Sequence, residues 1–104
     1  MIVGVPDSKL ADWLKDKEYI VATDEGEAVA IASGYYLATG KPATVFMQSD
    51  GYSNALNAIT TLMMPYNIPF ELKLSVRIDE PQHEIMGKKI YELMDIINDQ
   101  RTGD

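Results

Sequence analysis

One segment of the chain has the pattern of a strand followed at once by a helix: YIVATDEGEAVAIASGYYLA, residues 19–38. Its first residues are rich in β-formers. Asp24, followed three residues later by Glu27, has the spacing of a capping box at a helix N-terminus. The apolar run behind it predicts a helix over residues 25–38. This part of the sequence therefore predicts a β-α unit.

The same order of strand and helix recurs on both sides of that segment. Short apolar or alternating runs predict further strands at 2–5, 43–48 and 70–76, and amphipathic spacing predicts helices near 10–14, at 54–64 and beyond 84. Four strands alternating with four helices indicate right-handed βαβ crossovers. We expect a three-layer α/β/α domain over residues 1–98, with a mainly parallel sheet, helices on both faces, and a frayed tail at 99–104.

Composition narrows the range of partners. The 104 residues have a formal net charge of -7, with 16 acidic and 9 basic side chains and no cysteine. Such a charge repels nucleic acid and anionic membrane surfaces, so we expect neither as a partner. The absence of cysteine excludes disulfides, and no apolar run approaches the roughly 20 residues of a membrane span. These features favour a cytoplasmic protein.

The predicted helix 25–38 has hardly any polar face. A helix that is apolar all round must be buried all round, which a small domain does not easily achieve. The small residues Ala28, Ala32, Ser33 and Gly34 would let another backbone approach, so we expect a homo-oligomer through this helix. A central helix lying under a loop is the alternative.

Familiar catalytic motifs are absent. The chain lacks G-x-G-x-x-G, the phosphate-loop motif, G-x-S-x-G and H-E-x-x-H. His83 is the only histidine, and the neighbouring carboxylates Asp79, Glu80 and Glu84 have the pattern of solvated surface. We therefore expect no metal site on this chain. Ligands of parallel sheets gather at the carboxyl ends of the strands, so the turns at 6–8, 23–27, 48–54 and 77–83 are the candidate site.

Five segments together resemble a known family. They are Gly4–Ser8, Ala22–Tyr35, Ala38–Gly40, Met47–Gly51 with Asn54, and Asp79–His83. In this order they are similar to the pyrimidine-binding domain of thiamine-diphosphate-dependent decarboxylases, especially the phosphonopyruvate decarboxylases and sulfopyruvate decarboxylase alpha subunits. The resemblance implies thiamine diphosphate as cofactor and a small 2-oxoacid, sulfopyruvate or phosphonopyruvate, as substrate.

The resemblance gives Glu25 a catalytic role. Glu25 stands nine residues before Gly34-Tyr35, where the family has the glutamate that hydrogen-bonds the cofactor's aminopyrimidine ring. A carboxylate that shares a proton with the ring nitrogen stabilises the imino form needed to activate the cofactor. From the sequence pattern alone, Glu25 is a first-turn carboxylate that faces the helix dipole.

Other site residues follow from the same resemblance. His83 and Asp7 are expected to handle substrate protons, Arg77 to face a sulfonate or phosphonate, and Gln48 and Ser49 to lie beside the cofactor. The alternatives are a solvated loop histidine, a helix-capping Asp7 and a surface arginine. Ser49-Asp50 departs from the family's Asn-Ser, and an aspartate there is unfavourable beside an anionic substrate.

The diphosphate half of the site has no counterpart in this sequence. The family's diphosphate-binding domains carry Gly-Asp-Gly followed by paired asparagines, and this chain has no such pair. The resemblance thus implies a trimmed, alpha-type subunit, with Mg²⁺ and diphosphate held by a separate beta subunit. A non-catalytic remnant that serves assembly or regulation is the main alternative. An acetolactate-synthase relative is a third, disfavoured by the segment 79–83.

Overall fold

The computed structural model describes residues 1–99, and residues 100–104, the greater part of the expected tail, lie outside the described residues. In chain order the elements are β1 (Ile2–Gly4), η1 (Ser8–Leu10), α1 (Ala11–Leu14), β2 (Ile20–Val21), α2 (Glu25–Thr39), β3 (Ala43–Gln48), η2 (Ser49–Gly51), α3 (Tyr52–Ala58), η3 (Ile59–Met63), β4 (Phe70–Ser75) and α4 (Pro81–Asn98). The strands form one parallel sheet in the order β2-β1-β3-β4. The predicted fold class is confirmed, and β4 lies at an edge of the sheet. Among residues 1–99, no helix is both long and apolar enough to span a bilayer.

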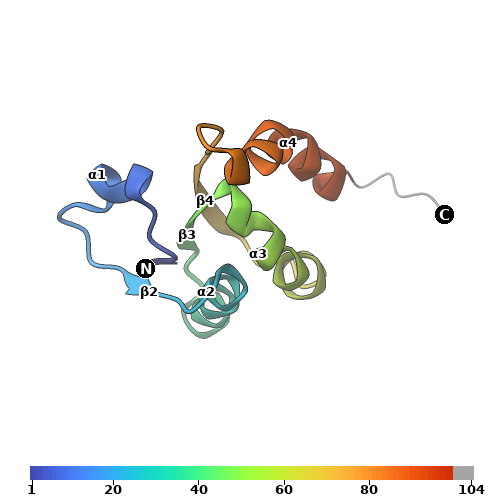
Figure 1. Cartoon of the computed structure of the whole chain (residues 1–104). Helices are drawn as coiled ribbons and strands as arrows, with labels where there is room; N and C mark the ends of the chain where they lie inside the picture. Colours follow the sequence, from blue (N-terminus) through green and yellow to red (C-terminus); the bar gives the residue numbers. More distant parts are fainter. Residues whose placement is uncertain (100–104) are drawn as a thin grey trace.

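The two faces of the sheet are covered unequally. Figure 1 shows α1 on one side of the sheet and α2, α3 and α4 on the other. On the larger side, Val3, Val45 and Met47 are fully buried in one apolar cluster with residues of all three helices. On the smaller side, Phe46 forms a second, smaller cluster with the buried Leu10 and Leu14 and the partly buried Ile2 and Trp13. Most of the core therefore lies between the sheet and α2–α4.

The N-terminus of α2 is fixed by side-chain caps. The Asp24 carboxylate accepts a hydrogen bond from Glu27 N at 2.9 Å, as the sequence predicted. The reciprocal bond of a capping box is not formed, because the Glu27 carboxylate accepts from the backbone N–H and hydroxyl of Thr23 instead. The helix starts at Glu25, so the candidate catalytic carboxylate lies at its first position.

The orientation of α2 corrects one part of the interface prediction. Ala28, Ala32 and Ser33 are buried inside the domain and do not lie on a free face. The outer face carries Gly34 and Leu37, and the Leu37 side chain is 68% exposed. The helix is therefore apolar on its outer face without being buried there, which leaves that face able to meet another chain.

The third helix begins earlier than the sequence predicts. Ser49–Gly51, for which the sequence predicts a non-helical turn, is a 3-10 turn that runs directly into α3. The last five residues of the helix, Ile59–Met63, form a π-helix.

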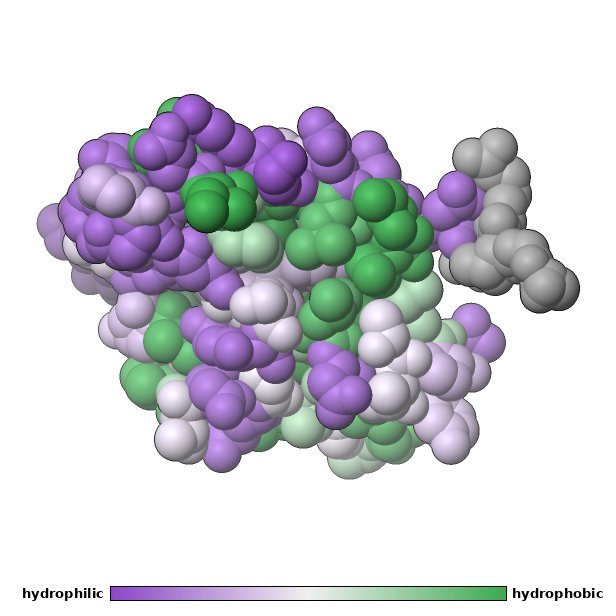
Figure 2. All heavy atoms as spheres, turned by 45° about the vertical axis from the view of Figure 1, so that its right-hand side comes forward, coloured by the Kyte–Doolittle hydropathy of each residue, from purple (hydrophilic) through white to green (hydrophobic). Residues whose placement is uncertain are grey.

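An apolar cavity of about 400 Å³ lies between this π-helix, the start of β4 and the end of α4. Figure 2 shows apolar atoms gathered on this side of the molecule.

Candidate functional site

The short turn η2 joins the loops that hold the candidate residues. Its first residue, Ser49, accepts a hydrogen bond from Arg77 N at 3.0 Å through its hydroxyl. Asp50 hydrogen-bonds the Nδ1 of His83. Gly51 lies against the side chain of Glu25. Three consecutive residues after β3 thus contact the start of α2, the end of β4 and the start of α4, as expected for the carboxyl ends of parallel strands.

Glu25 is a buried carboxylate held in one orientation. The residue is 8% exposed, and its Oε1 accepts a hydrogen bond from Asn54 Nδ2 at 3.1 Å. Gly51 makes this placement possible, because a Cβ at position 51 would lie 2.4 Å from Glu25 Oε2. Asn54 belongs to the segments that resemble the family, but nothing in the sequence pattern indicates its contact with Glu25.

Asp7 and Arg77 form an ion pair at the end of β1. Arg77 Nη1 lies 2.7 Å from Asp7 Oδ1, and the two side chains are 10% and 6% exposed. Asp7 also accepts hydrogen bonds from Ser75 Oγ at 3.0 Å and Gln48 Nε2 at 3.4 Å. Its expected capping role is present too, since it accepts from Lys9 N. Asp7 therefore ties together the ends of β1, β3 and β4.

The guanidinium of Arg77 is occupied by carboxylates. Besides Asp7, it donates to Asp79 at 3.3 Å and to Glu80 at 3.4 Å. The hydrogen bond to Asp79, followed by the contacts with Asp7, raises the pKa of Arg77 above its ordinary value, against the effect of burial. The alternative of a surface arginine does not hold, and an anionic substrate would have to displace carboxylates to reach this group.

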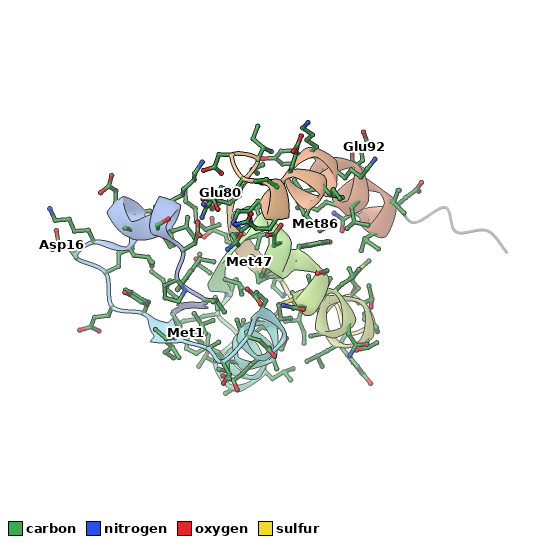
Figure 3. The ribbon with its side chains drawn as sticks, in the orientation of Figure 1. Met1, Asp16, Met47, Glu80, Met86 and Glu92 are labelled. Atoms are coloured by element: carbon green, nitrogen blue, oxygen red, sulfur yellow. The ribbon has the colours of Figure 1, made fainter. Side chains whose placement is uncertain are left out.

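Asp79 and Glu80 are the exposed partners in this cluster. A backbone hydrogen bond, followed by the one from Arg77, lowers the pKa of Asp79 below its ordinary value. Figure 3 shows Glu80 at the turn before α4, with Met86 and Met47 farther in, between the helices and the sheet. The polar cluster therefore lies at the rim of the core.

His83 lies in the first turn of α4 and not in a solvated loop. Its side chain is 14% exposed, and its Nδ1 faces the carboxylate of Asp50. The neighbouring Glu84 points elsewhere and pairs with Lys88 at 2.6 Å. That pairing lowers the pKa of Glu84. The sequence did not indicate the Asp50 contact.

The residues fit one half of thiamine diphosphate. Glu25 is the buried carboxylate that would meet a pyrimidine ring, and the end of β3 carries Gln48 Oε1, a buried oxygen without a hydrogen-bond partner among the described residues. Within residues 1–99, no three Asp, Glu or His side chains cluster closely enough to hold a metal ion.

The chain is similar to known thiamine pyrophosphate enzymes. Residues 1–67 match the family model "Thiamine pyrophosphate enzyme, N-terminal TPP binding domain". The chain is 33% identical to a phosphonopyruvate decarboxylase of Streptomyces viridochromogenes, over 91% of this chain and 26% of that protein. It is 39% identical to the sulfopyruvate decarboxylase subunit alpha of Methanocaldococcus jannaschii, over 91% of this chain and 62% of the relative. The chain thus spans less than two thirds of either relative.

A solved structure shows the same fold. The X-ray structure of a Mycobacterium smegmatis protein assigned as a thiamin diphosphate-dependent enzyme superposes with a TM-score of 0.67 at 26% sequence identity. The match covers 84% of this chain and 20% of that chain.

Proposed function

Because this chain belongs to the family of N-terminal thiamine pyrophosphate-binding domains, we propose that it is the pyrimidine-binding, alpha-type subunit of a split thiamine-diphosphate-dependent 2-oxoacid decarboxylase. The observation that carries the proposal is Glu25, a buried carboxylate at the first position of α2, held by Asn54 and packed on Gly51. Its position at the carboxyl edge of the sheet suits a group that must meet a bound ring.

The role of Glu25 is to hold and move one proton. When bound, thiamine diphosphate supplies the electron sink that makes decarboxylation of a 2-oxoacid possible. Glu25 shares its proton with a nitrogen of the pyrimidine ring, and burial excludes water that would compete for that hydrogen bond. The amide of Asn54 donates to Oε1, so the other oxygen, Oε2, remains for the ring.

The partner in this proposal is a beta subunit that holds the diphosphate and Mg²⁺. One observation supports it: relatives of this chain are named as subunit alpha. Sulfopyruvate and phosphonopyruvate are the proposed substrates, because the relatives act on these 2-oxoacids by name. Arg77 already faces three carboxylates. We therefore assign recognition of the substrate's sulfonate or phosphonate group to the partner subunit.

The oligomer in this proposal includes a second copy of this chain. Its contact surface is the outer face of α2, where Ala30, Gly34 and Leu37 are exposed. An exposed apolar helix face of this kind is a common basis for association between subunits.

A non-catalytic module for assembly or regulation remains the second candidate. One observation favours it: Asp7 and Arg77, both expected on the substrate side, neutralise each other in a buried pair.

One experiment distinguishes the enzyme from the non-catalytic module. The native protein is purified with its bound chains, and carbon dioxide release is then measured with sulfopyruvate and phosphonopyruvate. Co-purification of a diphosphate-binding subunit with activity supports the enzyme. A complex that contains such a subunit but shows no activity supports the module.

A further inference from the structure

The contact between Asp50 and His83 is built from two elements far apart in the sequence. Asp50 is the middle residue of η2, and His83 lies 33 positions later, in the first turn of α4. The Asp50 carboxylate and the Nδ1 of His83 are hydrogen-bonded. Only 14% of the His83 side chain and 30% of the Asp50 side chain are exposed. The pair is thus largely shielded from water without being sealed off.

The backbone on both sides holds this pair in place. Gly87 lies one helical turn after His83 and therefore on the same face of α4. A Cβ at position 87 would lie 1.9 Å from the carbonyl oxygen of Arg77, so the lack of a side chain lets α4 press directly on the chain leaving β4. The N–H of that same Arg77 donates to Ser49, the neighbour of Asp50. One peptide segment therefore fixes the helix that carries the histidine and the turn that carries the aspartate.

The two ring nitrogens of His83 have different surroundings. Nδ1 faces a carboxylate, which accepts a hydrogen bond from an N–H. Among residues 1–99, no group hydrogen-bonds Nε2, and Nε2 is not among the buried atoms that lack a partner. A neutral ring therefore carries its proton on Nδ1 and its lone pair on an accessible Nε2. This arrangement suits a group that accepts and returns a proton.

The carboxylate of Asp50 lies at the start of a helical stretch and faces one polar partner. It lies in the first turn of the continuous helical stretch from η2 into α3, where the helix dipole favours negative charge. Its Oδ1 is buried and has no hydrogen-bond partner in the described part of the chain. The main polar contact of this carboxylate is therefore the hydrogen bond between its Oδ2 and Nδ1 of His83. The residue that departs from the family pattern thus has a specific partner and is more than an unfavourable charge.

We propose that Asp50 is a positioning residue that fixes the Nδ1–H tautomer of His83 and leaves Nε2 to transfer protons on the substrate side. The catalytic part rests on the proposed decarboxylase function. In that reaction the protonated ring gives its Nε2 proton to the carbon from which carbon dioxide has left. One N–H bond breaks, one C–H bond forms, and the neutral ring then regains a proton from water. Asp50 keeps its hydrogen bond to Nδ1 throughout.

The tautomer can be measured on the chain itself, without cofactor or partner, because His83 is its only histidine. Long-range ¹H–¹⁵N NMR spectra of the neutral ring should show the Nδ1–H form as the main species. In Asp50→Ala, the balance should return to that of a histidine side chain free in water, whereas Asp50→Asn, whose amide oxygen still accepts a hydrogen bond, should retain part of the preference. A wild-type ring in the Nε2–H form, or an unchanged tautomer in a folded Asp50→Ala, would overturn the positioning role.

Glu84→Gln is the matched control. It removes the carboxylate next to His83 in sequence, one that pairs with Lys88 instead, so the tautomer should not change. If Asp50→Ala does not fold, as judged by circular dichroism, the wild-type tautomer and the Asp50→Asn spectrum still decide the question.

The catalytic part is tested in the assembled enzyme. Asp50→Asn and His83→Asn should each lower kcat, on the order of 10² for His83→Asn, with little change in KM, and the double variant should lose no more than the histidine variant. A tautomer shift with unchanged kcat would overturn the catalytic part alone. If the wild-type complex has no decarboxylase activity, the proposed function and the catalytic part of this inference fail together, while the NMR result still decides the positioning role.

Discussion

The carboxylate of Glu25 lies so close to the backbone of Gly51 that no side chain fits between them. A Cβ at position 51 would be 2.4 Å from Oε2 and 2.6 Å from Cγ of Glu25. Glu25, which starts α2, and Gly51, which precedes α3, are therefore in contact. The orientation of the Glu25 carboxylate depends on the lack of a side chain at position 51, which is 26 residues later in the sequence.

This relationship predicts that Gly51→Ala lowers activity while leaving the free energy of unfolding nearly unchanged. The added methyl group must push the Glu25 carboxylate aside, while alanine in a helical turn gains up to about 1 kcal/mol over glycine. The free energy of unfolding in urea should change by less than about 1 kcal/mol. Hydrogen exchange at the cofactor's C2, measured with the partner subunit present, should fall on the order of 10².

Ser53→Ala is the control for that variant. Ser53 is exposed, and its hydroxyl donates to the backbone carbonyl of Asp50. The exchange rate should remain near that of the wild type. If Gly51→Ala also exchanges at the wild-type rate, Glu25 is not the group that activates the cofactor.

The strands and helices could be predicted because each carries a local signal. Asp24 marks the start of α2, and apolar runs mark the strands. The continuous helix from η2 into α3 was missed, because Ser49-Asp-Gly51 has the composition of a turn. The inward face of α2 was also missed: a helix without a polar stripe gives no sequence signal for the side that packs on the sheet.

The contacts within the site have no such local signal, because they join residues that are far apart in the sequence. Asp7 meets Arg77 across 70 positions, and Asp50 meets His83 across 33. Nothing in the neighbourhood of either residue specifies its partner, since the pairs form only when the carboxyl ends of the strands come together. The sequence could name Asp7, Arg77 and His83 as candidates, but it could not show that Arg77 is already paired.

Burial of Tyr52 predicts a loss of stability in alkaline solution. Burial raises the pKa of Tyr52 above its ordinary value of 10.0. The protonated phenol is therefore favoured in the folded state, and its contribution is complete below pH 10. As pH rises past 10, the unfolded chain loses the proton first, so the free energy of unfolding should fall until the folded phenol also ionises.

Tyr52→Phe should flatten this alkaline decrease, because phenylalanine has no proton to lose. Urea unfolding at pH 8 and pH 11 checks the slope. Tyr66→Phe, at a side chain that is 70% exposed, should leave the decrease as it is. A Tyr52→Phe variant that loses stability as steeply as the wild type would contradict the assignment.

The orientation of α2 predicts that two charge substitutions in this helix have different effects, one on assembly and the other on folding. Leu37→Glu places a carboxylate on the exposed apolar face and should dissociate a dimer into folded monomers, as measured by light scattering at micromolar concentration. Ala32→Glu buries a charge at a position that is 1% exposed and should prevent folding. A wild-type chain that is a stable monomer would contradict the proposed contact along α2.

Glu25→Gln is the most direct test of the proposed function. The substitution keeps the size of the side chain, and its amide oxygen can still accept the hydrogen bond from Asn54, so folding and assembly should be retained. It cannot share a proton with a pyrimidine nitrogen. With the partner subunit present, C2 hydrogen exchange and decarboxylation should therefore fall together by about 10² to 10⁴.

Two neighbouring carboxylates provide the controls for Glu25→Gln. Asp24 caps Glu27 N, and Glu27 accepts from Thr23, so Asp24→Asn and Glu27→Gln alter only the helix end. They should lower the free energy of unfolding by at most about 2 kcal/mol and leave turnover near that of the wild type. Equal losses of turnover in all three variants would indicate a general effect of charge at this helix end. A normal rate in Glu25→Gln alone would mean that another group activates the cofactor, because the buried carboxylate beside Gly51 is then dispensable.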